Sequence, residues 1–360
     1  MKTKLKAQAV LALSIQLAFS AGALANPTGA QVVAGQVAFG QPNAATLAIT
    51  NSPGAIINWQ SFSIGQGEIT RFIQQSASSA VLNRVVGANL SQIYGTLSSN
   101  GRVFLVNPAG IVVGASGIID TAGFVASTLP MLDADFLAGK LAFRGGADSG
   151  AIANHGSIRT GYGGRVMLIA PNIENSGLIE TPGGGIVLAA GRKVSIASLD
   201  LDGVQFEVQA PEDSALNLGR LIADGGAVGV FAGTLTHSGV IRAGSLVRDA
   251  AGEIVLRAAG DVRLEAGSAT SADGRSGGAV SIESAGATAR VAGGVSATGS
   301  HGAGGRIEVL GGKVTLAAGA SLDASGSSAG GTILAGGATT RARIRMSAIR
   351  RRPTSIPPRG

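Results

Sequence analysis

The sequence has no cysteine, few aromatic residues and, beyond Ala25, no apolar run long enough to cross a membrane. Without cysteine, folding cannot depend on disulfide bonds. Because only ten Phe, two Tyr and one Trp are present, a core has to be built from Val, Ile, Leu and Ala. Glycine is abundant instead, at 57 of 360 residues against a usual share of about 7%. This composition favours tight turns that are repeated many times.

The segment from Met1 to Ala25 has the pattern of a secretory signal peptide. Its basic start consists of Lys2, Lys4 and Lys6. A mostly apolar stretch follows and ends before Ala23-Leu24-Ala25, which predicts cleavage between Ala25 and Asn26. The alternative, a membrane anchor, is disfavoured because polar side chains interrupt a run that is already shorter than the ~20 residues a span needs. We therefore expect an exported protein, and the lack of cysteine suits a chain that stays unfolded while it crosses membranes.

The net charge of +7 points to a polyanion partner only until the charges are located. Three basic residues lie in the predicted signal peptide and seven lie between Arg341 and Arg359, and neither segment contains an acid. Residues 26–340 therefore carry 18 basic and 21 acidic residues, a net charge of −3. A folded body with this charge is not expected to bind nucleic acid.

A unit of two short apolar strands joined by glycines repeats along the second half of the chain. Gly156–Thr160 leads into Gly164–Ala170, and Gly177–Thr181 leads into Gly185–Ala190. The first apolar residue of the second strand recurs at Val166, Ile186, Val228, Ile254, Val280, Ile307 and Ile333. The steps from Val228 onward are nearly equal, whereas the step from Ile186 to Val228 is much longer, and we interpret that long step as two coils. Regular steps of this size with short strands indicate a solenoid.

The alternation of apolar residues decides which solenoid this is. Leucine-rich repeats need a Leu-x-x-Leu-x-Leu framework and helical repeats an apolar period near 3.6, and the sequence has neither. Residues i and i+2 of a strand point the same way, so Val166 and Leu168 are predicted to face inward, stacked on Ile186 and Leu188. The sequence thus predicts an all-β fold, a right-handed parallel β-helix with small inward residues such as Ala170 and Ala190. Glycine pairs should mark one corner, at 163–164, 183–184, 225–226, 277–278, 304–305 and 330–331.

The segment from Asn26 to about Leu141 lacks this period and is the predicted N-terminal capping region. It holds the only Trp, Trp59, and six of the ten Phe, of which the last, Phe136, lies at its boundary with the repeats. A solenoid needs its first coil covered, because an unpaired strand edge promotes aggregation. We expect this segment to be the most globular part of the chain.

Six motifs in the capping region carry a family resemblance. The first three are Ile57–Gly65, Arg71-Phe72 and Ser78–Val85. The other three are Ser91–Gly95, Gly101–Ile111 and Val125–Thr128. Together they strongly resemble the N-terminal secretion domain of filamentous haemagglutinins and related adhesins, over roughly residues 30 to 145.

This resemblance implies a two-partner secretion exoprotein, a filamentous-haemagglutinin-like adhesin of the Gram-negative type of export. Its N-terminal domain would direct transport through an outer-membrane β-barrel partner with periplasmic recognition domains. The product would be secreted or displayed at the cell surface, where a host-cell receptor or glycan would be its ligand. The expected division is a signal peptide at 1–25, the secretion domain with its cap at 26–145, β-helix repeats at 146–338 and a basic, disordered tail at 339–360.

The candidate secretion motif is Asn107-Pro108-Ala109-Gly110, followed by Ile111. The family usually has Asn-Pro-Asn-Gly, so Ala109 departs from it. Proline at the second position fixes φ and glycine follows without steric cost, which makes the motif a sound β-turn. Two interpretations stay open: the turn only starts a coil, or it also helps the transporter to recognise the exported chain.

The main alternative is a β-helix enzyme that degrades polysaccharides. Such a site needs carboxylates close together on one sheet face. The candidate pairs, each placed on one strand face by its i, i+2 spacing, are Asp133 with Asp135 and Asp200 with Asp202. No basic residue recurs one coil away, so we expect no catalytic residue and no enzyme.

Metal or cofactor binding is not expected either. The three histidines lie far apart beside glycine-rich turns and are predicted to be exposed: His155, His237 and His301. Ser271-Ala272-Asp273-Gly274 is a single fragment of the calcium-binding repeat, which needs copies in series.

The arginine-rich tail breaks the repeat at about Thr339. It is interpreted either as an anchor to an anionic surface or as the product of a truncated or frame-shifted gene. The second interpretation adds a further alternative for function, a non-functional fragment of a longer adhesin.

Overall fold

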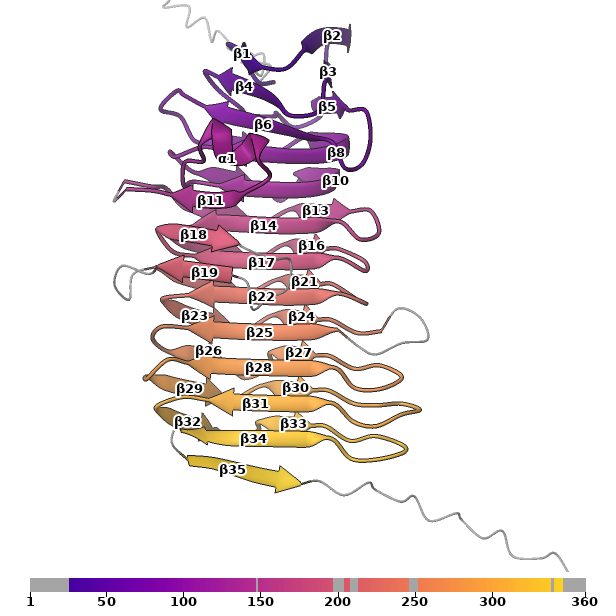
Figure 1. The fold of residues 1–360 in the computed structure, drawn as a ribbon, viewed down its shortest axis with the longest axis vertical. Coiled ribbons are helices and arrows are strands. Elements are labelled where there is room, and N and C mark those ends of the chain that lie inside the picture. The colour runs from indigo at the N-terminus through magenta and orange to yellow at the C-terminus, as the bar shows by residue number, and fades with distance from the viewer. Residues whose placement is uncertain are drawn as a thin grey trace, which may run out of the picture.

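The computed structural model describes residues 26–146, 148–196, 204–207, 213–245, 252–337 and 340–345. The predicted signal peptide lies outside the described residues. The described chain is a parallel β-helix whose coils stack along one long axis (Figure 1). The long front strands run leftwards while successive coils progress downwards, and this combination makes the coil right-handed. The predicted fold class is confirmed.

Three parallel ladders of strands form the walls of the coil. Ladder A consists of β4 (Ala55–Trp59), β6 (Ala80–Val85), β8 (Thr96–Val106), β10 (Ile118–Ser127), β14 (Arg165–Ala170), β17 (Gly185–Ala190), β22 (Ala227–Ala232), β25 (Glu253–Ala258), β28 (Ala279–Ser284), β31 (Arg306–Leu310) and β34 (Thr332–Gly337). Ladder B consists of β3 (Thr46–Asn51), β5 (Ile69–Ile73), the first halves of β8 and β10, β13 (Ser157–Thr160), β16 (Leu178–Glu180), β21 (Arg220–Ile222), β24 (Val240–Arg242), β27 (Ala269–Ser271), β30 (Gly294–Ser296) and β33 (Ser321–Asp323). Ladder C consists of β7 (Ser91–Ile93), β9 (Ile111–Val113), β12 (Ile152–Asn154), β15 (Asn172–Asn175), β20 (Ser214–Asn217), β23 (Thr234–His237), β26 (Val262–Leu264), β29 (Thr288–Val291) and β32 (Lys313–Leu316).

The interior of the coil is filled by alternate apolar residues, as predicted. Val166 pairs in register with Ile186, and Leu168 with Leu188, and all four side chains are buried in one continuous core. Ala170 and Ala190 belong to the same core. Each inward side chain therefore packs on its counterpart one coil away, which removes apolar surface from water along the whole axis.

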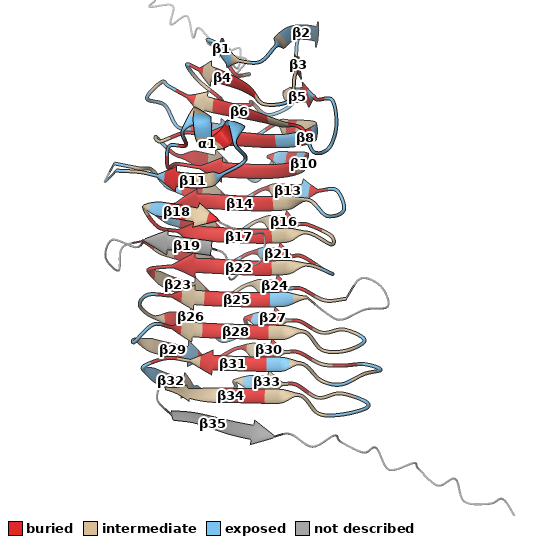
Figure 2. Ribbon diagram, viewed as in Figure 1, coloured by how far each residue is buried: buried red, intermediate tan, exposed pale blue. Residues whose placement is uncertain are grey.

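A second core lies outside the coil, on the outer face of ladder A. The strands β14 and β17 are buried on both faces, which Figure 2 shows as long red stretches. They are covered by the short helix α1 (Asp133–Leu137), by β11 (Leu141–Arg144) and by β18 (Lys193–Ile196). β18 pairs antiparallel with β11 and with β19 (Val204–Glu207). Met167, Val187 and Phe143 are among the buried residues of this outer core. The continuous apolar runs in ladder A are the sequence signature of this burial on two faces.

The long step from Ile186 to Val228 is one coil and not two, so that interpretation was wrong. Ile186 pairs directly with Val228 in the β17–β22 ladder. The additional residues form the insertion that contains β18 and β19, which leaves the coil, pairs with β11 and covers the outer core.

The capping elements are shorter than the segment predicted from Asn26 to Leu141. Parallel stacking already begins where β3 pairs with β5 and β4 with β6. The N-terminal end is closed by antiparallel strands, β1 (Gln31–Ala34) on β4 and β2 (Val37–Asn43) on β3. At the other end β35 (Thr340–Arg345), in the segment predicted as a disordered tail, runs antiparallel along β34. The division predicted between residues 145 and 146 stays a prediction, and the ladders run through it from β10 to β13 and β14.

The glycine pairs mark one corner, as predicted: all six precede a ladder A strand. The first glycine adopts a positive φ in three of them, 75° at Gly163, 62° at Gly183 and 76° at Gly225. The second glycine is needed for a different reason. A Cβ on Gly184 would overlap the carbonyl oxygen of Gly164 in the preceding coil, so the stacked corners have no room for a side chain.

Candidate functional site

The candidate secretion motif forms the turn between β8 and β9, where the chain leaves ladder A and enters ladder C. The backbone N–H of Gly110 donates to the carbonyl oxygen of Asn107 at 3.1 Å and closes the turn. Gly110 has a φ of 128°, a conformation that favours glycine. Its carbonyl oxygen accepts from the N–H of Ser91 at 2.9 Å, and the N–H of Asn107 donates to Ser127 at 2.9 Å. The turn is thereby fixed to the coils on both sides.

The side chain of Asn107 is buried and fully hydrogen-bonded. Its Nδ2 donates to the carbonyl oxygen of Asn89 and to Oγ of Ser91, both at 3.0 Å, and its Oδ1 accepts from the N–H of Ala109 at 3.0 Å. The last bond is the local turn that asparagine makes with its own backbone two residues on. Ala109, the departure from the family pattern, is exposed, and Ile111 enters the inner core.

The other motifs of the resemblance are also joined from coil to coil. The indole Nε1 of Trp59 donates to Oδ1 of Asn83 at 2.9 Å, and Nδ2 of Asn83 donates to the carbonyl oxygen of Phe104 at 3.2 Å. Both polar side chains are buried, so their hydrogen bonds fix the register of three successive strands. Arg84, the next residue of β6, points away from the coil interior, and its Nη2 lies 2.5 Å from Oδ1 of Asp133 in α1. These motif residues therefore stabilise the fold.

A ladder of buried amides, which the sequence analysis missed, runs through ladder C. Nδ2 of Asn154 donates to Oδ1 of Asn175 at 2.7 Å, and Nδ2 of Asn175 donates to Oδ1 of Asn217 at 2.8 Å. The next rung is His237, whose Nδ1 lies 3.1 Å from Nδ2 of Asn217. The signal in the sequence was an Asn two residues before the glycine of three successive Gly-x-Ile/Leu turns, at Asn154, Asn175 and Asn217.

The prediction that all three histidines are exposed was wrong for His237. His155 and His301 are exposed, but His237 is fully buried, and burial lowers its pKa to about 4. Since Nδ1 of His237 accepts from Asn217, its proton is on Nε2, which faces the carbonyl oxygen of Ala269 at 3.4 Å. The neutral imidazole thus ends the amide ladder.

The first pair of candidate catalytic carboxylates does not share a strand face. Asp133 and Asp135 lie in α1 and not on a strand, so the prediction of a shared strand face was wrong. The other pair, Asp200 with Asp202, lies outside the described residues. Asp273, of the fragment that resembles a calcium-binding repeat, accepts hydrogen bonds from Ser271, Ser296 and Thr298. Burial opposes ionisation of Asp273, but these hydrogen bonds lower its pKa below the ordinary value.

Within the described residues, no group of His, Asp and Glu is arranged to hold a metal ion, and no helix is long and apolar enough to cross a membrane. Of the predicted cleavage site, Ala25 lies outside the described residues. Asn26 is the first residue described, and its Oδ1 accepts from Oγ1 of Thr70 at 2.9 Å.

These features define a class of protein, a β-helical domain whose signature motifs are tight turns and buried hydrogen bonds between coils. The model of the TPS secretion domain family matches residues 23–282, more than half of the chain. The chain therefore belongs to the family of two-partner secretion domains, as the motifs indicated.

Solved and curated proteins agree with this assignment. The chain is 32% identical to the HMW1 secretion domain from Haemophilus influenzae, whose crystal structure superimposes with a TM-score of 0.77 over 86% of this chain and 94% of that one. Two heme/hemopexin-binding proteins of Haemophilus influenzae, one from strain Rd, are 38% identical over 102 residues and 43% identical over 77. These matches cover 28% and 21% of this chain, but the chain spans only 11% and 8% of the length of those relatives.

Members of this family are adhesin-like exoproteins, exported through the periplasm and secreted or displayed at the surface of Gram-negative bacteria. Family membership also implies an outer-membrane β-barrel transporter as the partner.

Proposed function

We propose that this chain is an exported, filamentous-haemagglutinin-like adhesin whose residues 26–145 direct its transport through an outer-membrane β-barrel with periplasmic recognition domains. The observation that carries the proposal is the similarity to the HMW1 secretion domain over 94% of that domain. The predicted signal peptide, cleaved between Ala25 and Asn26, supplies the preceding step, export to the periplasm.

The turn from Asn107 to Gly110 is the proposed recognition element. The amide of Asn107 is buried in the folded state, with its donors and acceptor satisfied inside the chain. A partner could therefore read this amide only before the turn folds. We propose that the transporter binds the segment while it is unfolded, and that the buried hydrogen bonds of Asn107 form once the coil closes.

The test is the secretion of Asn107→Ala from cells that also make the transporter. Recognition of Asn107 predicts that less protein reaches the medium while signal cleavage stays intact. Asn175→Ala is the matched control, because Asn175 is equally buried and hydrogen-bonded but lies outside residues 26–145. Undiminished secretion of Asn107→Ala, or an equal loss in both variants, would contradict a targeting role and leave the turn a structural element.

Adhesion is proposed to use the exposed outer faces of the ladders, where a host-cell receptor or a glycan would bind. Stacked polar side chains support this: Arg263 of β26 pairs in register with Arg290 of β29, and both are exposed on ladder C. Binding of the purified protein to epithelial cells or erythrocytes is the measurement. Failure to bind any cell type or glycan would contradict the adhesive role and leave the export proposal standing.

A further inference from the structure

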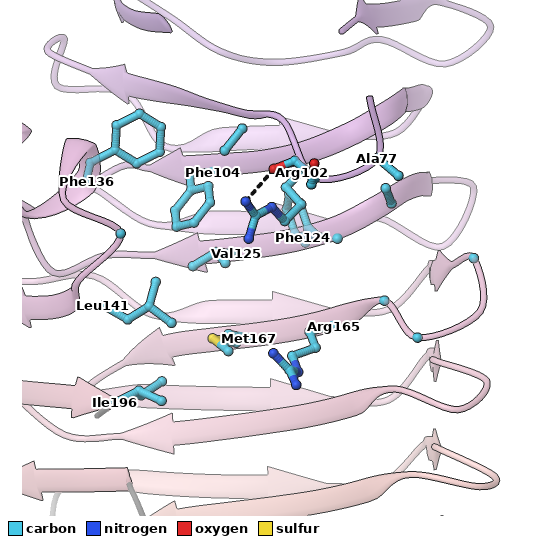
Figure 3. Close-up of a pocket in the computed structure, with 18 of the residues that line it drawn as sticks. Ala77, Arg102, Phe104, Phe124, Val125, Phe136, Leu141, Arg165, Met167 and Ile196 are labelled. Carbon is cyan, nitrogen blue, oxygen red and sulfur yellow. Dashed lines mark hydrogen bonds between the residues drawn. The ribbon is translucent and has the colours of Figure 1, made fainter. Parts of the chain in front are cut away.

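A cavity of about 650 Å³ lies on the outer face of ladder A, beside the outer core (Figure 3). Its floor consists of Phe104, Val125 and Met167, which pair in register on three successive strands, β8, β10 and β14. Phe136 of α1 and Leu141 of β11 form part of its wall. The cavity thus opens where the cover of the outer core ends, and its floor is apolar.

Two arginines stand at one side of this floor. Arg102 pairs with Gly123, and the register of the next pair places Gly123 beside Arg165. The two arginines are therefore two strand spacings apart, about 10 Å. Both side chains lie in the cavity with the apolar residues, as Figure 3 shows.

Gly123 leaves room for the side chain of Arg102 to lie across the sheet. A Cβ at this position would be 3.1 Å from Cγ of Arg102, closer than ordinary van der Waals contact. The stem of Arg102 therefore packs over the glycine, while its guanidinium donates to the carbonyl oxygen of Ser78. An arginine held over glycine has a fixed position and keeps further donors for a ligand, since guanidinium carries five N–H groups.

Among the described residues that line the cavity, the charged side chains are those of Arg102 and Arg165, and none is an Asp or Glu. Its volume lies within the range of about 300–1,000 Å³ that is typical of sites for small molecules. An apolar floor beside two cations complements a ligand that has a hydrocarbon body and an anionic head.

We propose that this cavity binds a single-chain anionic amphiphile, such as a long-chain fatty acid. Its carboxylate contacts Arg102 and Arg165, and its hydrocarbon chain packs on Phe104, Val125 and Met167. Arginine suits this role because its planar group makes paired hydrogen bonds to a carboxylate. The site is independent of export, since it belongs to the folded protein.

The test is calorimetric titration of the protein with dodecanoate below its micellar concentration. Dodecyltrimethylammonium, which has the same chain length and the opposite charge, is titrated in parallel. The proposal predicts saturable binding of one dodecanoate per chain and much weaker binding of the cation. Absence of saturable dodecanoate binding, or equal affinity for both amphiphiles, would overturn it. This comparison uses the unmodified protein, so it does not depend on how any variant folds.

Substitutions then locate the site. Arg102→Gln and Arg165→Gln should each weaken dodecanoate binding about tenfold, because each removes a charge-assisted contact. Arg220→Gln is the matched control, an exposed arginine of ladder B outside the cavity lining, and should leave binding unchanged. Binding that survives both cavity substitutions together, with unchanged circular dichroism, would place the ligand elsewhere and refute the assignment.

Discussion

Acid should destabilise the folded protein through one buried histidine, His237. Its pKa is lowered from 6.5 to about 4 by burial, and neither of its hydrogen-bond partners, Asn217 and Ala269, is charged. A proton on Nδ1 would also face the amide N–H of Asn217, which already donates to that nitrogen. The folded state therefore resists protonation on both counts.

The sign and size of the effect follow from linkage. Between pH 6.5 and 4 the unfolded chain binds a proton at this histidine and the folded chain does not, so stability falls as the pH falls. The loss is about 1.4 kcal/mol per pH unit in this window, or about 2 kcal/mol at pH 5. Above pH 6.5 and below pH 4, His237 adds no further dependence of the free energy of unfolding on pH.

The assay compares the protein with His237→Asn in guanidinium unfolding at pH 7 and pH 5, followed by circular dichroism. The asparagine can still accept from Asn217, so the ladder persists while the titrating group is gone. We expect the protein to lose about 2 kcal/mol more than the variant between the two pH values. His301→Asn, at an exposed position, should behave like the unsubstituted protein. Equal losses in the protein and in His237→Asn would refute the reasoning.

Three further substitutions test the packing, each by the same unfolding measurement at pH 7. Asn175→Leu should cost about 3 kcal/mol, because it leaves a buried donor and a buried acceptor of the amide ladder without partners; a cost below about 1 kcal/mol would contradict the ladder. Phe143→Ala should cost about 3–5 kcal/mol, since Phe143 is fully buried in the outer core. Leu218→Ala, at an exposed leucine, should cost far less, and similar costs would argue against a second core. Gly184→Ala should cost about 2 kcal/mol or more because of the close backbone of the preceding coil, whereas Gly161→Ala meets no atom within 4 Å and should be nearly neutral; equal costs would contradict the tight corner.

The inner core could be predicted from the sequence because the repeat itself encodes it. Apolar residues at i and i+2, recurring at a regular step, leave few alternatives to stacked parallel strands. Val166 and Ile186 therefore pair as expected. The glycine pairs were equally informative, because the corner at Gly184 tolerates no side chain.

The outer core could not be predicted from this pattern. Alternation identifies the inward face of a strand, whereas runs such as Val166–Ala170 are apolar at every position and show only that both faces are buried. What covers the outer face is an insertion whose strand β18 pairs with β11, far earlier in the chain. Pairing between strands so far apart in the chain leaves no pattern in the local sequence. The insertion was therefore interpreted as an additional coil.

The burial of His237 was not predicted, for a related reason. His237 precedes a glycine-rich turn, and such residues are usually exposed. Its place was set by register with Asn217 in the preceding coil, which only the stacking reveals. The family resemblance identified Asn107 as a motif residue. Its burial and its three hydrogen bonds became visible only in the structure.

The most direct test of the central claim is whether release of the protein depends on its transporter. Cells that produce the chain with and without the outer-membrane β-barrel partner are fractionated, and the protein is quantified in medium and periplasm by immunoblot. Export by the two-partner route predicts protein in the medium or at the cell surface only when the transporter is present, and processed chain retained in the periplasm when it is absent. Equal release in both strains would contradict the claim.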